Sequence, residues 1–504
     1  MSLAIIYSRA AIGVESPLVT VEVHIANGLP ALSMVGLPEA AVKESKDRVR
    51  AAIVNGGFKF PSRRITINLA PADLPKEGGR FDLPIALGIL AASGQIPEAH
   101  LPAFEFVGEL ALSGALRPVK GIIPFAIQSQ QAHRKAIIPR ANEQEAALID
   151  AKHVLSSASL LEVCHYLHGQ QALKSCITES TAKPNRNHND LADISGQQHA
   201  KRALTIAAAG GHNLIMIGPP GSGKTMLASR LPGIMPPMSK NEAIETAAIT
   251  SISEQGFQQD QWGVRPFRTP HHTASGVALV GGGGNPRPGE ISLAHNGVLF
   301  LDELPEYDRK VLEVLREPLE AGKIIISRAA RQAEFPACFQ LVAAMNPCPC
   351  GYLGDSSGKC HCTSEQVQRY QNKISGPLLD RIDMHIEVTR VPLQKLKNNA
   401  NNTSAAVETS QQVALKVQQA HTLQLQRQQT CNAQMSTNMI KTYCALSVKD
   451  EGFLTMAIDR LNLSFRAYHK ILKVARTIAD LANTEQIQSK HLTEAMSYRK
   501  LDKA

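Results

Sequence analysis

The motif GPPGSGKT at residues 218–225 limits the possible folds of this chain more than any other feature of the sequence. It follows the apolar run 214–217 and precedes TMLASRL, which is the context of a strand, a glycine-rich turn and a helix. Glycines in such a turn let backbone N–H groups surround phosphate groups at the start of the helix. The predicted fold class is therefore α/β, with parallel strands around a site for ATP. The predicted phosphate-binding residues are Gly218, Pro219, Pro220, Gly221, Ser222, Gly223, Lys224 and Thr225.

Two residues of this loop, and two further along the chain, predict the chemistry of hydrolysis. In such loops the lysine, here Lys224, reaches the β- and γ-phosphates, and Thr225 offers its hydroxyl to Mg²⁺. In GVLFLDE, the apolar run 298–301 predicts a buried strand that ends at Asp302, where α/β sheets place their ligands. Asp302 would hold Mg²⁺, and Glu303 would polarise the attacking water as a general base. An apolar run before Asp-Glu is usually only a strand end, but after a phosphate loop it indicates a catalytic site.

The length of 504 residues exceeds what one hydrophobic core supports, so two or three domains are expected. Residues 171–190 are polar and suit an inter-domain linker. Residues 391–440 are rich in Gln and Asn, and suit a polar connector that contains one helix at about 405–430. The expected domains are residues 1–170, 191–390 and 441–504.

The formal net charge of +9 favours an acidic partner, of which nucleic acid is the commonest, although a mildly basic enzyme without such a partner fits equally well. The sequence has no apolar run as long as the roughly 18 residues of a membrane span, so no span is expected. The N-terminus lacks the pattern of a signal peptide. Nine cysteines, several of them clustered, indicate reduced thiols in a cytoplasmic protein and not a disulfide framework.

Five motifs together resemble the magnesium-chelatase-like AAA+ ATPases of the ComM/YifB family: GPPGSGKT, GVLFLDEL, VLREPLE, NPCPCGY and ISGPLLDRIDMHIEV. The resemblance covers nearly the whole chain and implies a P-loop AAA+ core with a helical lid at residues 441–504. It also implies that Asn346 is a polar sensor beside the γ-phosphate, that Arg381 is an arginine finger in the neighbouring subunit's site, and that Arg466 is a second sensor. By spacing alone, Asn346 fits a helix cap and the two arginines fit surface ion pairs. A finger that acts on a neighbour requires an oligomer, and the resemblance implies a homo-hexamer.

The segment from Arg64 to Pro139 resembles the proteolytic domain of Lon and the matching domain of RadA/Sms, through LPKEGGRFDLPIALGIL, FVGELALSGALRPVKG and KAIIP. The resemblance implies a Lon-protease-like α+β domain, a type also called ribosomal protein S5 domain 2-like. Arg80 and Phe125 stand where Lon has its catalytic serine and lysine. Because acyl chemistry needs an activated nucleophile, a non-proteolytic binding or assembly domain is predicted.

A cysteine cluster and a histidine pair are the candidate metal ligands outside this site. The pattern C-x-C-x9-C-x-C is formed by Cys348, Cys350, Cys360 and Cys362. Four soft ligands so close together suit a closed, structural Zn²⁺ site. The C-x-C spacing is tighter than the usual C-x2-C, so a cysteine-rich loop that binds no metal is the alternative. The pair His271–His272 has no third ligand at a matching spacing, so a structural role is predicted for it.

Two further segments are candidates for contact with a polyanion. In RPFRTPHHTASGVALVGGGGNPRPGEISLAHNG the family resemblance implies an inserted β-hairpin, and Arg265, Arg268 and Arg287 could meet phosphates. The segment IIISRAARQAEFPA predicts a second hairpin with Arg328 and Arg331 near its tip. Each arginine fits equally well a solvated position or a contact with the next subunit.

A hexameric ATPase motor that acts on single-stranded or branched DNA is the leading functional hypothesis. The family resemblance implies helicase or branch-migration activity in natural transformation or recombination, and the basic charge agrees with it. The alternatives are a chelatase-type motor that inserts metal into a porphyrin, and an ATP-dependent protein remodeller. Stimulation of ATP hydrolysis by DNA, and not by unfolded protein, would distinguish the DNA motor from the remodeller.

Overall fold

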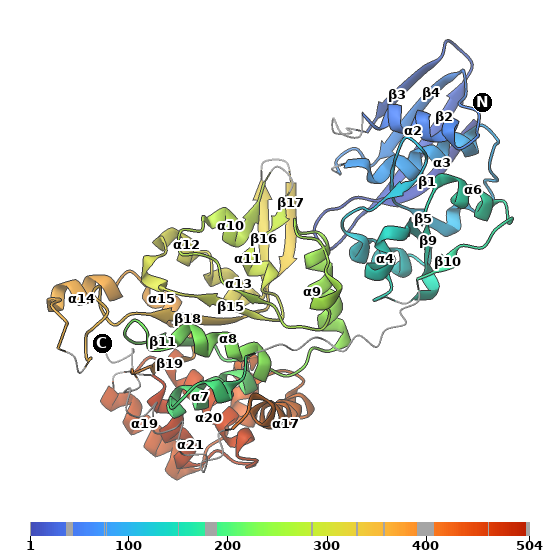
Figure 1. Ribbon diagram of the computed structural model, residues 1–504. Helices are drawn as coiled ribbons and strands as arrows, with labels where there is room; N and C mark the ends of the chain where they lie inside the picture. The colour runs from blue at the N-terminus through green and yellow to red at the C-terminus, as the bar shows by residue number, and fades with distance from the viewer. Residues whose placement is uncertain are drawn as a thin grey trace.

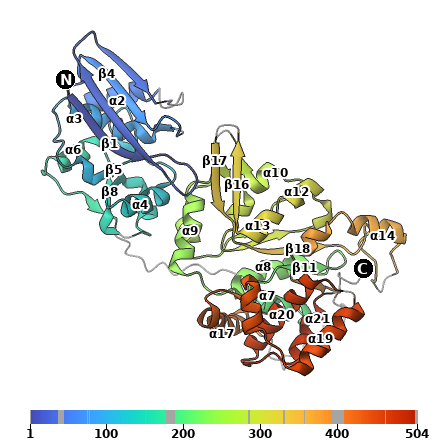
Figure 2. The ribbon, with the colours of Figure 1, turned by 180° about the vertical axis from the view of Figure 1, so that it is seen from behind.

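The computed structural model describes residues 2–36, 44–74, 76, 78–149, 151–176, 189–283, 286–328, 331–355, 358–390, 408–461 and 463–499. Figure 1 shows an N-terminal α+β region in blue and teal, a central α/β region in green to orange, and a C-terminal helical region in red. The central and C-terminal regions pack on each other. The N-terminal region meets the central region on one side, beside α9 (Figures 1 and 2).

A four-stranded sheet with the order β1-β2-β4-β3 forms the first half of the N-terminal region. The side chains of β2 alternate between the two faces of this sheet, and Val19, Val21 and Val23 are buried on the face that contacts α3. Helix α3 is buried along its whole length, so it forms the centre of this core. The elements are β1 Ser2–Arg9, β2 Leu18–Ala26, β3 Ala31–Val35, α2 Ser45–Asn55, β4 Arg64–Ala70 and α3 Asp82–Ala92.

A second four-stranded sheet, β10-β9-β8-β5, completes the N-terminal region. Its edge strand β10 lies inside the predicted linker 171–190, and Leu173 and Cys176 on either side of that strand are buried. The N-terminal fold therefore continues to Cys176, because these apolar side chains complete its core. Residues 177–188 of the predicted linker lie outside the described residues. The elements are β5 Phe104–Phe106, β6 Glu109–Leu110, β7 Leu116–Arg117, α4 Ile122–Gln131, β8 Lys135–Pro139, α5 Glu143–Ala146, β9 Val154–Ser157, α6 Leu160–Leu167 and β10 Lys174–Ser175.

A five-stranded parallel sheet, β12-β15-β18-β11-β19, forms the centre of the molecule and confirms the predicted α/β class. Because side chains alternate along a strand, Leu214 and Met216 join the core that contains α7 and α8, whereas Ile215 joins the core on the opposite face. Both faces are covered, which explains the nearly continuous apolar runs. The strands are β11 Leu214–Ile217, β12 Phe267–Arg268, β15 Val298–Leu301, β18 Gln340–Met345 and β19 Met384–Glu387.

Short helices and two hairpins connect these strands. The predicted second hairpin is present as β16 Lys323–Arg328 and β17 Arg331–Pro336, and it projects from the central region in Figure 1. A shorter hairpin, β13 Gly281–Gly282 with β14 Arg287–Pro288, lies between α10 and α11. The helices are α7 Gln198–Gly210, α8 Lys224–Ile234, α9 Lys240–Ser251, α10 Gly276–Val280, α11 Glu290–Leu293, α12 Arg309–Glu313, α13 Arg316–Ala321, α14 Ser364–Gln371 and α15 Gly376–Leu379.

The C-terminal region is helical and begins earlier than the predicted boundary at residue 441. Helix α17 has a polar sequence, but its Val413, Val417 and Ala420 are buried in the core shared with α7 and α20. The stretch from residue 408 to 440 is thus part of the helical region and not a connector, whereas residues 391–407 lie outside the described residues. The helices are α17 Ser410–Gln428, α18 Thr437–Tyr443, α19 Val448–Leu461, α20 Phe465–Leu481 and α21 Ser489–Ser497. None of the helices in the described ranges combines the length and the apolar character that crossing a membrane requires.

The N-terminal region contacts the centre through α4 and α9. Ala247 and Ala248 of α9 are buried together with residues of α4. The backbone N–H of Gly121 donates to the Ser251 carbonyl at 3.1 Å, and the Glu145 carboxylate accepts a hydrogen bond from the Ser251 hydroxyl. The N-terminal region is therefore attached to the helix that precedes the first glycine- and arginine-rich segment.

A buried ion pair joins the central sheet to the C-terminal helices. Asp383, which directly precedes β19, lies 2.9 Å from Lys470 Nζ on α20 and accepts the Asn213 backbone N–H at 2.9 Å. Burial opposes ionisation of Asp383, but Lys470 and His212 outweigh it, so the pKa of Asp383 lies below its ordinary value. The ion pair fixes the start of β19 against α20.

We expect Asp383→Asn to destabilise the chain by about 3 kcal/mol at neutral pH, because it leaves the buried Lys470 ammonium without its counter-charge. A depressed carboxylate pKa stabilises the fold above the unfolded pKa of about 3.9, and this contribution is lost as the pH falls below that value. The difference between wild type and variant in thermal unfolding should thus shrink in acid. Asp459→Asn, at an exposed position of α19, is the control. An equal stability of wild type and Asp383→Asn at pH 7 would contradict the assignment.

Candidate nucleotide-binding site

The phosphate loop joins the end of β11 to the start of α8. A side chain at Gly218 would place its Cβ 2.1 Å from the Val388 carbonyl oxygen, so glycine is required by the close approach of the two backbones. Gly223 has a φ of 91°, a left-handed conformation that other residues rarely adopt. The Ser222 hydroxyl is buried and has no hydrogen-bond partner among the described residues. A phosphate oxygen would provide the acceptor that this buried donor lacks.

The Lys224 side chain is buried at the base of this loop. Its Nζ donates to the carbonyl oxygens of Gly218 at 2.7 Å and Pro219 at 3.1 Å, and to Asn346 Oδ1 at 3.2 Å. Burial lowers the pKa of Lys224, while the carboxylates of Asp302 and Glu303 act in the opposite direction. Asn346, the predicted sensor at the end of β18, therefore lies next to the predicted phosphate-binding lysine.

Thr225 and Asp302 meet although they are far apart in the sequence. The Thr225 hydroxyl donates to Asp302 Oδ2 at 2.8 Å, and the Glu303 backbone N–H donates to Asp302 Oδ1 at 2.9 Å. The strands β11, β18 and β15 are neighbours, so their carboxyl ends bring these side chains to one edge of the sheet. A hydroxyl and a carboxylate are the hard oxygen ligands that Mg²⁺ prefers, and the donor set therefore fits the predicted Mg²⁺ site.

The structure adds a residue that the sequence analysis did not place at this site. His272 Nδ1 lies 3.3 Å from Glu303 Oε2, and the His272 ring packs against that of His271. The segment that carries His272 follows β12, and Tyr307, after Glu303, donates to the Pro270 carbonyl on the same segment at 2.6 Å. The pairing of β12 with β15 brings the two segments together, and only this strand order could have revealed the contact.

The two predicted arginines lie at the opposite, amino-terminal edge of the sheet. They line a cavity of about 930 Å³ together with Asn213, which directly precedes β11, and Gln340, the first residue of β18. Arg381 donates to the Pro377 carbonyl at 2.6 Å and pairs with Glu320, and Arg466 lies 3.5 Å from Asp380. The structure thus brings Lys224, Thr225, Asp302, Glu303 and Asn346 together, and places Arg381 and Arg466 on the other side of the sheet.

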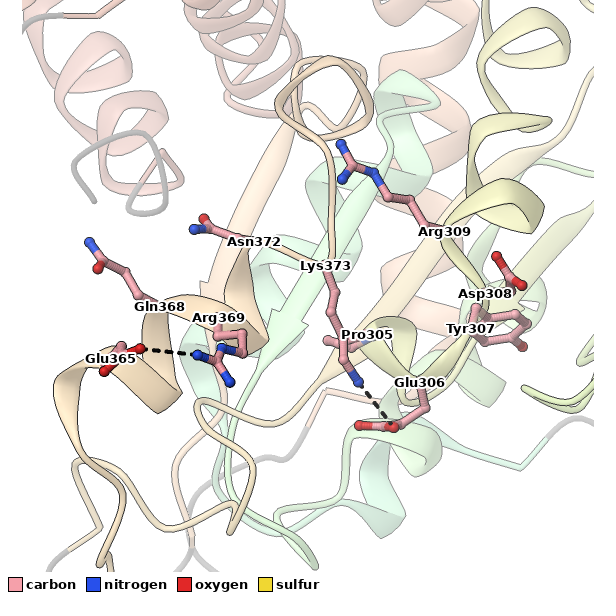
Figure 3. Close-up of a pocket in the computed structure, with 10 residues that line it drawn as sticks. All are labelled: Pro305, Glu306, Tyr307, Asp308, Arg309, Glu365, Gln368, Arg369, Asn372 and Lys373. Atoms are coloured by element: carbon pink, nitrogen blue, oxygen red, sulfur yellow. Dashed lines mark hydrogen bonds and ion pairs between the residues drawn. The ribbon is translucent and has the colours of Figure 1, made fainter.

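A groove borders the site just beyond Glu303. Residues 305–309 line it together with α14 and the residues after that helix, and Figure 3 shows Lys373 reaching Glu306 in an ion pair of 3.5 Å. Both acidic and basic side chains line the groove, and Arg369 is paired to Glu365 at 3.0 Å. This surface of mixed charge lies on the nucleotide side of the central region.

The four clustered cysteines are close enough to bind one metal ion. Their Sγ atoms all lie within 4.8 Å of one another, and Cys348 Sγ is 3.3 Å from Cys350 Sγ and 3.8 Å from Cys360 Sγ. A tetrahedral Zn²⁺ with Zn–S bonds of about 2.3 Å needs S···S distances of roughly 3.8 Å. The donor set and its spacing therefore fit the predicted zinc site, which Cys362 completes.

The basic segments are less available than their composition suggests. Arg265 has only 10% of its side chain exposed and donates to the Pro236 carbonyl at 2.7 Å and the Asn296 carbonyl at 2.6 Å, and Arg268 forms two bonds of 2.7 Å with Glu290. Arg287 has 55% of its side chain exposed and pairs with Glu254. The side chains of Arg328 and Arg331 lie outside the described residues, although their backbones form the end of the β16–β17 hairpin.

Neither Arg80 nor Phe125, the residues that the resemblance to Lon predicts at its catalytic dyad, supplies a nucleophile. Arg80 lies just before α3 and is 6% exposed, and Phe125 is fully buried in α4. A guanidinium and a phenyl ring cannot begin acyl transfer.

Comparisons with known proteins place the whole chain among related sequences. Models of the family described as magnesium chelatase subunit ChlI match residues 21–142 and 190–396, and a model of its C-terminal part matches residues 407–499. The chain is 54% identical to competence protein ComM of Haemophilus influenzae, over 99% of this chain and 98% of that protein. It is 51% identical to YifB of Salmonella typhimurium, over 100% of this chain and 98% of the relative. A more distant relative, the ATP-binding subunit ClpX of the Clp protease from Borrelia duttonii, is 24% identical over 33% of this chain and 40% of its own length.

We expect Lys224→Ala to weaken ATP binding on the order of tenfold to a hundredfold, because a charged donor to phosphate is lost. Titration of a fluorescent ATP analogue against the purified chain measures the effect. Lys240→Ala, at an exposed position in the first turn of α9, should bind like wild type. Equal affinities for Lys224→Ala and wild type would show that nucleotide does not bind at this loop.

Proposed function

The chain belongs to the magnesium-chelatase-like AAA+ ATPase family that includes ComM and YifB, and from this premise we propose that it is a ring-forming motor that hydrolyses ATP to act on DNA. One observation carries the proposal of a ring: the residues suited to bind and hydrolyse nucleotide lie at one edge of the sheet, whereas Arg381 and Arg466 lie at the other. A site that needs both groups requires two copies of the chain.

In the proposed hydrolytic site each residue has one task. Lys224 and the backbone of the phosphate loop hold the β- and γ-phosphates, and Thr225 and Asp302 hold Mg²⁺, which supplies charge neutralisation at the phosphates. Glu303 accepts the proton of the attacking water, and Asn346 orients the γ-phosphate beside Lys224. His272, which lies 3.3 Å from Glu303, restrains the general base.

The neighbouring subunit completes this site with Arg381 and Arg466. Arg381 is held by Glu320, 61% of whose side chain is exposed, so that an incoming phosphate can replace the carboxylate as its partner. The groove of mixed charge beside Glu303 offers the neighbour a complementary surface (Figure 3). We propose a homo-hexamer, as in other AAA+ rings.

DNA, single-stranded or branched, is the proposed substrate of the motor. The net charge of +9 and the hairpins β13–β14 and β16–β17 support this choice, and the relative ComM is named as a competence protein. Helicase or branch-migration activity is the proposed outcome of ATP hydrolysis.

The N-terminal region acts as a Lon-like, non-proteolytic binding or assembly domain, and the C-terminal helices act as the lid. We place the protein in the cytoplasm, where reduced thiols can hold Zn²⁺ at Cys348, Cys350, Cys360 and Cys362.

The function is tested by the rate of ATP hydrolysis with and without nucleic acid. We expect single-stranded or branched DNA to raise the rate, with a response that weakens as the salt concentration increases. Glu303→Gln should bind ATP with nearly unchanged affinity and lose roughly 10²–10⁴-fold in turnover, because the general base is removed while phosphate and Mg²⁺ contacts remain. Stimulation by an unfolded protein and not by DNA would instead support a protein remodeller, and stimulation by a metal-free porphyrin would support a chelatase-type motor.

The shared site is tested by mixing two inactive variants. Arg381→Ala should bind ATP yet lose on the order of 10³–10⁵-fold in hydrolysis, the loss measured for arginine fingers elsewhere. Lys224→Ala should also be inactive, but a mixed ring pairs the intact phosphate loop of one variant with the intact finger of the other. Arg460→Ala, at an exposed position of α19, is the control and should hydrolyse ATP normally. Recovery of activity on mixing is the expected result, and wild-type turnover by Arg381→Ala alone would exclude the trans role.

A further inference from the structure

The cysteine loop, defined as residues 347–363, directly follows the predicted sensor Asn346 in the sequence. Asn346 follows β18, and Cys348, the first cysteine, is two residues further on. The described residues of this loop form no helix or strand before α14 begins at Ser364. Its conformation therefore depends on turns, on side-chain contacts and on the cluster of four thiols.

The first turn of this loop packs closely against the phosphate loop. The backbone N–H of Gly351 donates to the Cys348 carbonyl at 2.9 Å, which closes the turn around Cys350. A Cβ at Gly351 would lie 2.7 Å from Pro220 Cδ and 3.7 Å from Asn346 Cγ. With a φ of 84°, Gly351 is in a conformation that favours glycine, so the turn lies against Pro220 and Asn346 in a way that a side chain would prevent.

Arg390 also contacts both of these loops. Its guanidinium donates to the Pro220 carbonyl at 2.9 Å, lies 3.6 Å from Asp355 Oδ2 and packs over the Tyr352 ring at 5.3 Å. Pro220 belongs to the phosphate loop, whereas Tyr352 and Asp355 belong to the cysteine loop. Pro220 of the phosphate loop thus contacts both the Gly351 turn and the Arg390 side chain.

We propose that a Zn²⁺ ion bound by Cys348, Cys350, Cys360 and Cys362 acts as a clamp on the phosphate loop, so that the affinity for nucleotide depends on the metal. The inference rests on the zinc site proposed above. The metal holds the turn around Gly351 in place. This turn then keeps Pro220 and Asn346 in the geometry that accepts the β- and γ-phosphates. Loss of the metal removes the ion that the four thiolates share, and the turn around Gly351 is then no longer restrained. Nucleotide binding then has to order the loop, which lowers the affinity.

The test measures zinc content and nucleotide affinity on the same preparations of the full-length chain. Wild type should carry about one zinc per chain by elemental analysis, since the cluster forms a single tetrahedral site. Cys360→Ser should lose the zinc and bind a fluorescent ATP analogue about tenfold more weakly. Arg390→Ala should keep the zinc and still bind nucleotide more weakly, because it breaks the link and not the metal site. Cys338→Ser, at an exposed cysteine of the opposite edge, should change neither quantity.

Two results separate the clamp from the zinc site on which it rests. Wild type without zinc, prepared under reducing conditions, would remove both proposals. Zinc that is present in wild type and lost in Cys360→Ser, with nucleotide affinity unchanged, would overturn the clamp and leave the zinc site in place. If Cys360→Ser does not fold, wild type stripped of metal by a chelator and then dialysed replaces it. In that case added Zn²⁺, and not added Mg²⁺, should restore the affinity, and equal affinity before and after Zn²⁺ would overturn the clamp.

Discussion

Two hydrogen bonds, from Lys224 to Asn346 and from Thr225 to Asp302, tie the carboxyl ends of three neighbouring parallel strands together. The remaining features of the nucleotide edge depend on this arrangement. The cysteine loop starts where β18 ends, beside Asn346, and the histidine pair follows β12, which pairs with the strand that leads to Glu303. A buried lysine is tolerated here because backbone and amide oxygens surround it, and because two carboxylates lie near enough to favour its charge.

The other edge of the sheet has the opposite character. There, Asp383 and Lys470 bind the C-terminal helices to the start of β19, and the cavity between them contains Arg381 and Arg466. Arg466 at the start of α20 and Arg381 just before β19 thus lie at the edge of the sheet opposite the phosphate loop of their own chain. In the proposed ring, catalysis therefore requires assembly, because each copy offers its phosphate loop at one edge of the sheet and its two arginines at the other.

Local patterns in the sequence predicted the parts that local geometry determines. The phosphate loop, the strand before Asp302 and the hairpin at residues 323–336 depend on contiguous residues, and all three elements are found in the structure. Long-range packing decided the rest. The contact of His272 with Glu303 follows from strand order, and the Arg265 guanidinium is taken up by hydrogen bonds to distant carbonyl groups. Helix α17 joins the core through a narrow apolar stripe within a mostly polar sequence. The predicted end of the first domain at residue 170 came too early for the same reason, because the long-range packing of Leu173 and Cys176 leaves no recognisable pattern in the sequence.

The central claim is that one nucleotide is held between the carboxyl edge of one subunit and the amino edge of the next. An ATP analogue with a photoreactive group on its γ-phosphate tests this claim directly, if the labelled peptides of the assembled protein are identified by mass spectrometry. The account predicts label on peptides from both edges, one containing Asn346 and one containing Arg381, although these edges lie on opposite sides of the sheet within one chain. Label confined to peptides of the carboxyl edge, in a sample that hydrolyses ATP, would contradict it.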